Sequence, residues 1–367
     1  MTIHPFTVDE PALPTAPGAA GWADFQAATA VRNAVEADAY GTGELGLTAE
    51  ELLPHWLNQD YAPARMLVAR VGPDIVARGI YGTLPDASAE VAWLAVEVLP
   101  DYRRRGIGTA LADRLEEIAA DEGRVKTLVY AASREAPGER LASPTGFGSV
   151  PLANPEVRFL LGRGYTLEQV ERGSRLPLPV EEGELARQHE RAAAASGPDY
   201  AVHRWADRTP EPWREDMALL RTRMTTDAPT AGLEEPEDVW TVQRLVEEEE
   251  AFAAGPRTTL TAVAEHLPSG RLAGFTELSV PAEAARPVHQ EDTLVLRGHR
   301  GHRLGMLLKI ANLQTLAAER PGHPSVITFN AEENRHMLDV NEAVGFVPIG
   351  YEGAWRRGTS RPPPAEP

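Results

Sequence analysis

Short runs in which apolar and polar residues alternate are separated by stretches in which apolar residues recur every three or four positions. The first spacing is typical of strands and the second of amphipathic helices. In the first half of the chain, the predicted elements are a helix at 22–39, strands at 65–70, 75–81 and 91–98, a helix at 109–122 and a strand at 127–131. The helix at 109–122 carries Leu111, Leu115 and Ile118 on one face, which predicts that it packs against a sheet.

The second half repeats this order. Its predicted elements are helices at 213–224 and 237–254, strands at 259–265, 271–280 and 292–296, a helix that begins near 304 and a strand at 325–329. The helix after 304 has an apolar face formed by Leu304, Leu307, Leu308 and Ala311. A repeated order of this kind indicates two copies of one domain.

Composition along the chain suggests where these domains begin and end. The first 20 residues are rich in Pro, Ala and Gly and are predicted to be a flexible arm, and residues 359–367 are predicted to be a disordered tail. Between them we expect an N-terminal domain at 21–180, a linker at 181–200 and a C-terminal domain at 201–358.

Bulk composition narrows the possible partners. The 367 residues suffice for two domains with a core each, and the formal net charge is −18. This charge argues against nucleic acid or an anionic membrane as a partner, because both require a basic surface. It agrees with a cationic substrate such as an amine, and equally with an acidic surface that only keeps the protein in solution. The absence of cysteine excludes disulfides and thiolate sites, and together with the absence of a signal-peptide pattern it predicts a cytoplasmic protein.

One signal occurs twice: a strand, a turn rich in Arg and Gly, and an amphipathic helix. The turns are Arg103-Arg-Arg-Gly-Ile-Gly108 and Arg300-Gly-His-Arg-Leu-Gly305, and their last glycines are 197 positions apart (305 minus 108). A helix N-terminus offers unpaired N–H groups, glycine permits close approach, and arginine adds charge and forked donors. Each turn is therefore expected to cradle the phosphates of a nucleotide-like cofactor.

Arg-x-x-Gly-x-Gly between a strand and a helix resembles the acetyl-CoA loop of the GNAT acetyltransferase superfamily. Arg103, Gly106 and Gly108 fill its three places in the first half, whereas Arg303 stands at the place of the first glycine in the second half. The segment 330–346 also resembles the superfamily's later Asn-to-Gly-Phe helix, of which the first half keeps only the end. The resemblance covers nearly the whole chain.

The resemblance implies an α/β fold of two tandem GNAT-like domains, each a mixed, mostly antiparallel sheet flanked by helices. It also implies N-acetyl (or other acyl) transfer from acetyl-CoA to a small-molecule amine. Two alternatives stay open: an acetyl-CoA-binding module without catalysis, and a protein-lysine acetyltransferase. The chain is expected to be a monomer or a homodimer.

The resemblance assigns cofactor binding to two sets of residues. They are Val96, Val98, Arg103, Arg104, Arg105, Gly106, Ile107, Gly108 and Thr109 in the first half, and Val295, Leu296, Arg300, Gly301, His302, Arg303, Leu304, Gly305, Met306, Asn334 and Asn341 in the second. Backbone N–H groups of 96–98 and 295–296 are expected to polarise the thioester carbonyl, as in an oxyanion hole.

Many members carry a tyrosine acid four residues before the late Gly-Phe, where this chain has Leu160 and Asn341. Asn341 can still hydrogen-bond to the thiolate or to the pantetheine. We place catalysis in the second half, because its later helix is more complete and its central strands are more polar. Glu277 and Asp292 are the candidate bases, and Tyr351 is the alternative acid.

Two polar features remain open. His299 and His302 lie in the second turn, but no third ligand stands nearby, so no metal site is predicted and surface or phosphate-side positions are expected. The turn-rich segment 221–230 is either an acceptor-site loop or an ordinary connector.

Overall fold

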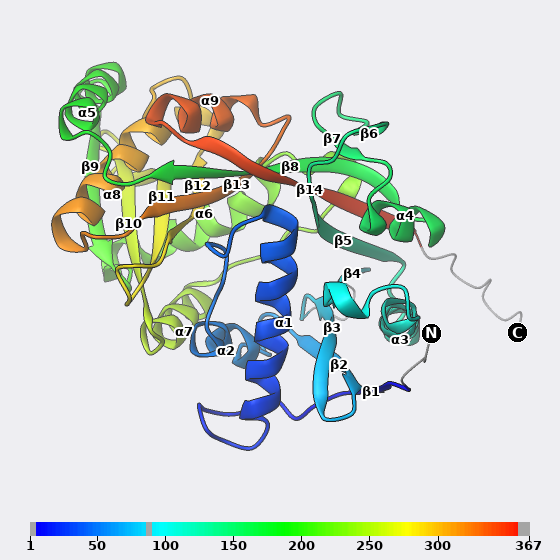
Figure 1. Cartoon of the computed structure of the whole chain (residues 1–367). Coiled ribbons are helices and arrows are strands. Elements are labelled where there is room, and N and C mark those ends of the chain that lie inside the picture. Colours follow the sequence, from blue (N-terminus) through cyan, green and yellow to red (C-terminus); the bar gives the residue numbers. More distant parts are fainter. Residues whose placement is uncertain (1–4, 86–89, 359–367) are drawn as a thin grey trace, which may run out of the picture. The chain divides into compact units, whose positions relative to one another are not determined.

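The computed structural model describes residues 5–85 and 90–358, and the chain divides into two compact units. Unit 1 consists of Met1–Glu171, Thr230–Glu235 and Gly350–Pro367, and unit 2 of Arg172–Pro229 and Pro236–Ile349. Each unit is a mixed sheet with helices on both faces, so the predicted α/β fold class is confirmed (Figure 1). Among the described residues, no helix combines the length and the apolar character that crossing a membrane requires.

Unit 1 has the strand order β1-β2-β3-β4-β5-β14-β8, and β4–β5 is a parallel pair between antiparallel ones. Its strands are β1 (Thr7–Asp9), β2 (Ala64–Val71), β3 (Asp74–Thr83), β4 (Val91–Val98), β5 (Lys126–Ser133), the start of β8 (Thr166–Pro177) and the end of β14 (Val347–Gly358). Its helices are α1 (Trp22–Tyr40), α2 (Ala49–Leu57), α3 (Ile107–Asp121) and α4 (Pro155–Gly162). A separate hairpin joins β6 (Arg140–Ala142) to β7 (Ser149–Pro151).

The alternation along β2 explains why helices cover both faces of this sheet. Leu67 packs with Leu111 of α3 on one face, and the next residue, Val68, packs with Phe25 of α1 on the other. Successive side chains of a strand point to opposite faces, so the apolar run at 66–69 needs a cover on each side. The sheet thereby holds α1 and α3 at fixed places relative to the end of β4.

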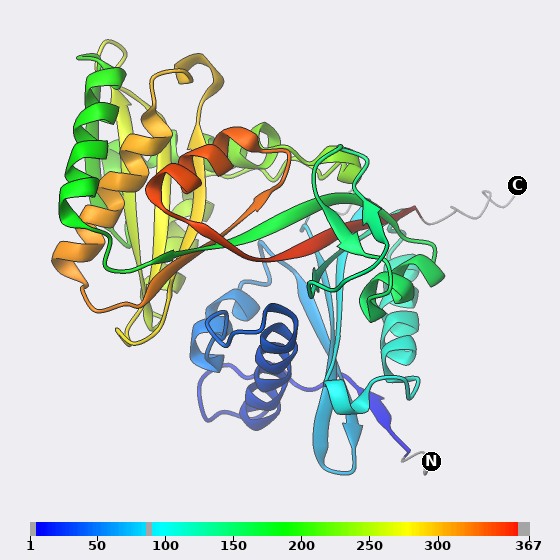
Figure 2. The same ribbon diagram turned by 45° about the horizontal axis from the view of Figure 1, so that its top comes forward.

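Unit 2 has the strand order β8-β13-β12-β11-β10-β9, again with one parallel pair, β12–β13. Its strands are the end of β8, β9 (Tyr200–Ala206), β10 (Arg257–His266), β11 (Arg271–Pro281), β12 (Val288–Val295), β13 (Ser325–Ala331) and the start of β14. Its helices are α5 (Glu182–Ser196), α6 (Arg214–Asp227), α7 (Val242–Ala253), α8 (Leu304–Glu319) and α9 (Arg335–Val344). Helices α5 and α8 lie side by side (Figure 2). Ala262 of β10 packs with Leu308 of α8, whereas the next residue, Val263, packs with Met217 of α6.

Two segments predicted to lack regular structure are partly ordered. The predicted linker at 181–200 contains helix α5, because Leu185 and Ala192, seven residues apart, pack into the cores of unit 2. The predicted arm contains strand β1, in which Thr7 pairs with Arg70 of β2. In both cases a tertiary contact organises a segment whose own composition gives a weak signal. The predicted tail at 359–367 lies outside the described residues.

The last strand also changes the predicted domain boundaries. Residues 350–358 of β14 belong to unit 1, where they pair antiparallel with β5 from Tyr351↔Ser133 to Gly358↔Lys126. Residues 230–235 belong to unit 1 as well. The predicted continuous C-terminal domain at 201–358 therefore does not coincide with unit 2, because an alternating pattern predicts a strand without predicting which sheet it joins.

Candidate functional site

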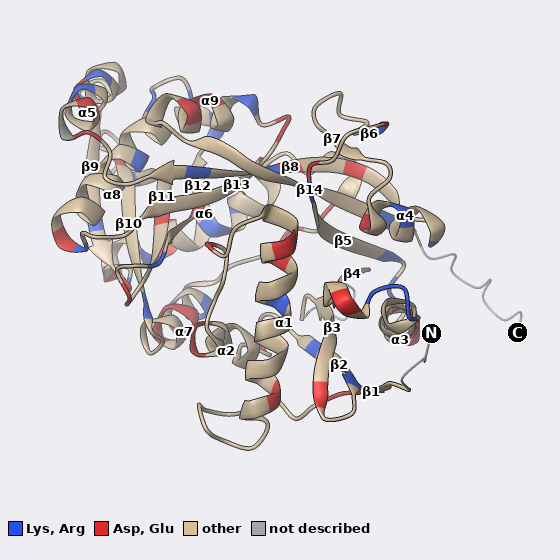
Figure 3. Ribbon diagram, in the orientation of Figure 1, with Lys and Arg blue, Asp and Glu red and all other residues tan. Residues whose placement is uncertain are grey.

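Each unit carries its Arg- and Gly-rich turn between a strand and a helix. In unit 1 the chain passes from β4 through a short 3₁₀ turn, Pro100–Tyr102, into α3. In unit 2 it passes from β12 through Arg297–His299 into α8. Figure 3 shows the basic run of unit 1 as a continuous blue stretch just before α3. We refer to 103–108 as the first cradle and to 300–305 as the second cradle.

The first arginine of the first cradle is bound to its own unit. Nε of Arg103 donates to the Val98 carbonyl oxygen at 3.0 Å, and Nη1 donates to Oδ2 of Asp38, near the end of α1, at 2.8 Å. The guanidinium therefore holds the turn against β4 and α1. This bracing role differs from the expected direct contact with phosphate.

The second cradle repeats this arrangement with equivalent partners. Nε of Arg300 donates to the Val295 carbonyl oxygen at 3.0 Å, and Nη2 donates to Oδ2 of Asp227, the last residue of α6, at 3.2 Å. In both units the arginine reaches the carbonyl five residues before it and an aspartate at the end of a helix. Asp38 and Asp227 were not predicted from the sequence, because nothing in the local pattern links a helix end to a distant turn.

Both cradles need a left-handed backbone at the same two places, the second and fourth positions. Arg104 and Gly106 have φ of 62° and 85° in unit 1, and Gly301 and Arg303 have φ of 90° and 53° in unit 2. Each cradle thus has glycine at one place and a strained arginine at the other. The arginine that interrupts the motif in the second half therefore preserves the backbone course of the turn.

The helix N-termini behind the cradles fit a phosphate. Neither N-cap residue, Gly106 for α3 or Arg303 for α8, caps its helix with a side-chain hydrogen bond. A Cβ added at Gly305 would meet nothing within 4 Å, and one at Gly108 would make only ordinary contacts, with Val98 at 3.5 Å and Val96 at 3.8 Å. No described neighbour requires glycine there, so these positions leave the first-turn N–H groups accessible to an anion. The side chains of Ile107 and Leu304 point into the cores, which leaves only their backbone for contact with a cofactor.

The strand before each cradle separates from its parallel neighbour after a short contact. β4 pairs with β5 only from Val91 to Trp93, and β12 pairs with β13 only at Val288 and His289. Beyond these residues the two strands diverge, so the facing backbone groups of β4 and β12 lack a ladder partner among these strands. The gap suits the extended arm of a CoA thioester.

The direction of the backbone N–H groups selects among the predicted carbonyl donors. The Leu296 N–H donates to the Ala273 carbonyl of β11 at 2.9 Å, so the prediction that Leu296 polarises a thioester is wrong. Adjacent N–H groups of a strand point to opposite sides, so the N–H of Val295 points toward the gap beside β13. The N–H groups of Val96 and Val98 in unit 1 likewise point away from β3, because the Leu99 N–H donates to the Val76 carbonyl of β3.

The two predicted base candidates are brought together by an arginine. Nη2 of Arg221, on α6, lies 2.7 Å from Oε2 of Glu277 on β11, and its Nη1 lies 3.5 Å from Oδ2 of Asp292 on β12. Thr261 donates to Glu277 Oε1 at 3.3 Å. The Arg221 guanidinium also lies over the ring of Trp240, 5.1 Å from its centroid. We call Arg221, Glu277 and Asp292 the carboxylate cluster.

The two carboxylates differ in access to solvent. The side chain of Glu277 is 5% exposed, and burial raises its pKa to about 7 although Arg221 opposes the shift. The side chain of Asp292 is 39% exposed, and burial of its carboxyl group also raises its pKa, again against Arg221. Both groups are therefore weaker acids than usual, and Asp292 is the one that an acceptor can reach.

A β-bulge places these residues. The register of β11 with β12 shifts between Thr276 and Leu278, so that Glu277 lies opposite two residues of β12, Glu291 and Asp292. A bulge of this kind redirects side chains and is frequent beside active sites. The corresponding pairing of β3 with β4 in unit 1 has no register shift.

Unit 1 has no counterpart of the carboxylate cluster at these positions. With the cradles aligned, Glu277 corresponds to Ile80 and the bulge to Ala95, and these two residues face each other across β3 and β4. Unit 1 instead buries other ion pairs, among them Arg32–Glu36 at 2.8 Å, and burial raises the pKa of Glu36 to about 7. The strand positions next to the gap therefore differ in chemistry between the units.

The predicted residues of the later helix take structural positions. Asn334 caps α9, where its Oδ1 accepts from the Met337 N–H at 3.3 Å. Asn341 is 1% exposed and donates from Nδ2 to Oδ1 of Asn330 at 2.7 Å, while its own Oδ1 is buried without a hydrogen-bond partner. Asn341 therefore has a buried amide with one unpaired oxygen, and its contact with the pantetheine stays a prediction.

Tyr351, the alternative acid, lies outside unit 2. It lies in unit 1, where it packs with Leu160 and Trp355 beside β5. It therefore does not belong to the carboxylate cluster of unit 2. The segment 221–230, for which both an acceptor-site loop and an ordinary connector were open, is helical as far as Asp227. Its first residue, Arg221, is a functional candidate that was not identified from the sequence. The polarity of this segment was the only signal.

Comparison with known proteins agrees with this geometry. The fold and the doubled cradle are similar to those of a solved protein with two GNAT domains in tandem. Residues 33–142 match the acetyltransferase (GNAT) family, and no curated protein matches the chain. The family match supports acetyl transfer as the general reaction, and members of the family generally bind acetyl-CoA.

Solved structures show the same fold over the whole chain. A tandem GNAT protein from the clavulanic acid biosynthesis pathway, solved without acetyl-CoA, is 23% identical with a TM-score of 0.69, and the match covers 98% of this chain and 100% of that one. A GCN5-related N-acetyltransferase from Sphaerobacter thermophilus is 16% identical with a TM-score of 0.59, over 96% of this chain and 95% of that one. The expected tandem GNAT architecture is thus confirmed.

Proposed function

We propose that this protein transfers an acetyl group from acetyl-CoA to a small-molecule amine, and that unit 2 carries the reaction. The observation that supports unit 2 is the carboxylate cluster at the bulge of β12, next to the gap in front of the second cradle. Ile80 and Ala95 at the corresponding places of unit 1 have no proton acceptor.

Different residues of unit 2 bind the cofactor, stabilise negative charge and accept the proton. First-turn N–H groups of α8 would hold the phosphates of an acyl-CoA, which supplies the acetyl thioester. The N–H of Val295 faces the gap, where it can stabilise negative charge on a carbonyl oxygen. Asp292, exposed beside that gap, takes the proton from the substrate ammonium, directly or through water.

Glu277 and Arg221 orient the side chain of Asp292. The buried Glu277 fixes Arg221 with its carboxylate, and Arg221 in turn fixes the orientation of Asp292. Both carboxylates also attract a cationic acceptor, in agreement with the net charge of −18. We accordingly treat Asp292 as the proton acceptor and Glu277 as a positioning residue.

The direct test is incubation of the protein with acetyl-CoA and a panel of primary amines, with release of free CoA thiol as the readout. We expect release that depends on the amine and a product with one added acetyl group by mass spectrometry. The matched control replaces each amine by its quaternary ammonium analogue, which has no proton to lose and must not react. Tight binding of CoA without turnover of any amine would contradict a catalytic role.

A further inference from the structure

Four rings gather beside the second cradle. Tyr200 of β9, His266 at the end of β10, and His299 and His302 of the turn approach one another with centroid distances of 5.4 Å for Tyr200–His266, 5.2 Å for Tyr200–His302 and 4.8 Å for His266–His299. The Tyr200 hydroxyl and Nδ1 of His299 lie 2.9 Å apart. We call these four residues the imidazole cluster.

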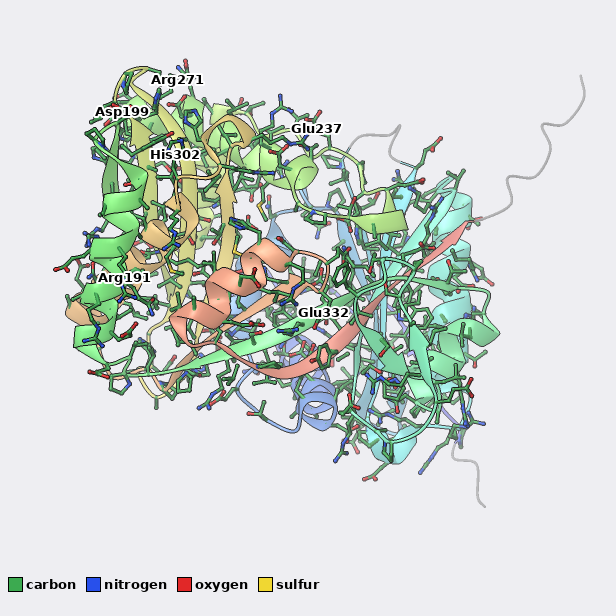
Figure 4. All side chains as sticks on the ribbon, turned by 90° about the horizontal axis from the view of Figure 1, so that it is seen from above. Arg191, Asp199, Glu237, Arg271, His302 and Glu332 are labelled. Atoms are coloured by element: carbon green, nitrogen blue, oxygen red, sulfur yellow. The ribbon has the colours of Figure 1, made fainter. Side chains whose placement is uncertain are left out.

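The imidazole cluster is part of the phosphate site by position. His299 directly precedes Arg300, and the exposed His302 stands between the two left-handed residues of the turn, Gly301 and Arg303. Figure 4 shows His302 at the same end of unit 2 as Asp199, the residue that precedes β9. A phosphate bound by the N–H groups of the first turn of α8 would therefore lie near these rings and interact with them electrostatically.

The groups that face the cluster come from three elements. Asp199 stands before Tyr200 on β9 and contributes with burial to a raised pKa of the Tyr200 hydroxyl. Ser269, in the turn after β10, lies 2.8 Å from Nδ1 of His266. The turn itself contributes the cations Arg300 and Arg303, and no metal-binding group of three or more His, Asp or Glu side chains occurs among the described residues.

These surroundings oppose protonation while no anion is bound. Partial burial, together with the charges of His266 and His302, lowers the pKa of His299. An anionic phosphate beside the rings reverses this effect, because an opposite charge nearby favours the protonated form. Histidine changes its charge near neutral pH, so the change falls within an ordinary working range.

The first cradle has different residues at the positions that correspond to His299 and His302. With the cradles aligned, Tyr102 replaces His299 and Arg105 replaces His302. The Arg105 guanidinium lies over the Tyr102 ring, 5.0 Å from its centroid, and its Nη2 donates to the Asp101 carbonyl at 2.6 Å. The positive charge of the first cradle is therefore permanent, whereas part of that of the second depends on pH.

We propose that the imidazole cluster binds the phosphorylated end of an acyl-CoA with uptake of a proton, so that the second cradle binds its cofactor more tightly as pH falls. The inference rests on the proposed function, because it takes the second cradle as a CoA site. It adds that the imidazole cluster couples cofactor binding to pH in one unit of the tandem and not in the other.

The test is calorimetric titration of the full chain with CoA at pH 6, 7 and 8, in two buffers of different ionisation enthalpy. Gly108→Glu, which places a carboxylate in the first cradle, leaves only the second to be measured, and Gly305→Glu leaves only the first. The monoester phosphate of CoA itself titrates near pH 6, so the first cradle supplies the reference slope. Uptake of one proton changes the dissociation constant by at most about tenfold per pH unit.

Between pH 8 and pH 6 we expect the affinity of the second cradle to rise about tenfold more than that of the first. The double variant His299→Gln with His302→Gln is expected to lose this excess, because a glutamine amide does not take up a proton in this range. His203→Gln is the matched control, because His203 lies in the same sheet but pairs with Glu265 outside the cluster. Equal slopes for both cradles, or an unchanged slope in the double variant, contradict the inference alone. Absence of CoA binding to the second cradle at every pH contradicts the proposed function as well.

Discussion

At the scale of single residues, Asp292 and Glu277 share one arginine but differ in access. Asp292 is 39% exposed and Glu277 is 5% exposed, and burial raises the pKa of both. A carboxyl group with a raised pKa accepts a proton more readily but must first be ionised. The rate is therefore expected to increase with pH as Asp292 and its neighbour Glu277 ionise, and burial raises the pKa of Glu277 to about 7.

Substitution separates the two roles. Asp292→Asn removes the proton acceptor, so kcat is expected to fall at least about 100-fold at every pH. Glu277→Gln leaves Arg221 to pair with Asp292 alone, which favours the ionised Asp292, so the acid limb of the pH profile is expected to move to lower pH with a smaller loss of kcat. The measurement is kcat and kcat/KM from pH 5 to 9, with Glu265→Gln as an acidic control in the same sheet. A profile of Glu277→Gln identical to that of the wild type is the outcome that opposes this division of roles.

The strained arginines of the cradles give a test of stability. Arg104, at the second position of the first cradle, and Arg303, at the fourth position of the second, have left-handed φ values. Arg105, at the third position of the first cradle, does not. Arg104→Gly and Arg303→Gly are each expected to raise the free energy of unfolding by about 1 kcal/mol, because glycine adopts this conformation without a steric cost. Arg105→Gly is the matched control and is expected to give no gain. Urea unfolding measures the differences, and a loss of stability in both variants argues against the strain.

At the scale of elements, the sequence predicted the cradles better than their surroundings. The spacing of Leu111, Leu115 and Ile118 predicted helix α3, and the turns before α3 and α8 lie where the motif placed them. These features depend on neighbours in the chain. The braces from Arg103 to Asp38 and from Arg300 to Asp227 depend on pairs 65 and 73 residues apart, which a local pattern does not contain.

The candidate site shows the same limit. Glu277 and Asp292 were identified as polar residues on central strands, but their common partner Arg221, which lies within the helix predicted at 213–224, was not identified as a candidate. Asp292 lies opposite Glu277 because of a bulge in β12. No residue type at that place predicts a bulge. Register and partner choice, rather than element type, are what the sequence failed to supply.

At the scale of the whole molecule, the two halves of the sequence are not the two structural units. Residues 350–358 complete the sheet of unit 1 by pairing with β5, which removes Tyr351 from the site that the sequence assigned to it. The tandem order was predicted from the repeat and is confirmed. The division of work between the units is the central proposal, and it rests on the carboxylate cluster that unit 1 lacks.

The most direct measurement of that division compares Gly305→Glu with Gly108→Glu in acetyl transfer, with initial rates measured from sub-saturating to saturating acetyl-CoA at a fixed concentration of amine. A Cβ is tolerated at both positions, so each variant is expected to fold and to lose one cradle only. The account predicts that Gly305→Glu lowers kcat/KM at least about 100-fold, and that Gly108→Glu keeps it within about threefold. Loss of turnover in Gly108→Glu, with CoA still bound by the second cradle, would assign the reaction to unit 1 and contradict the account.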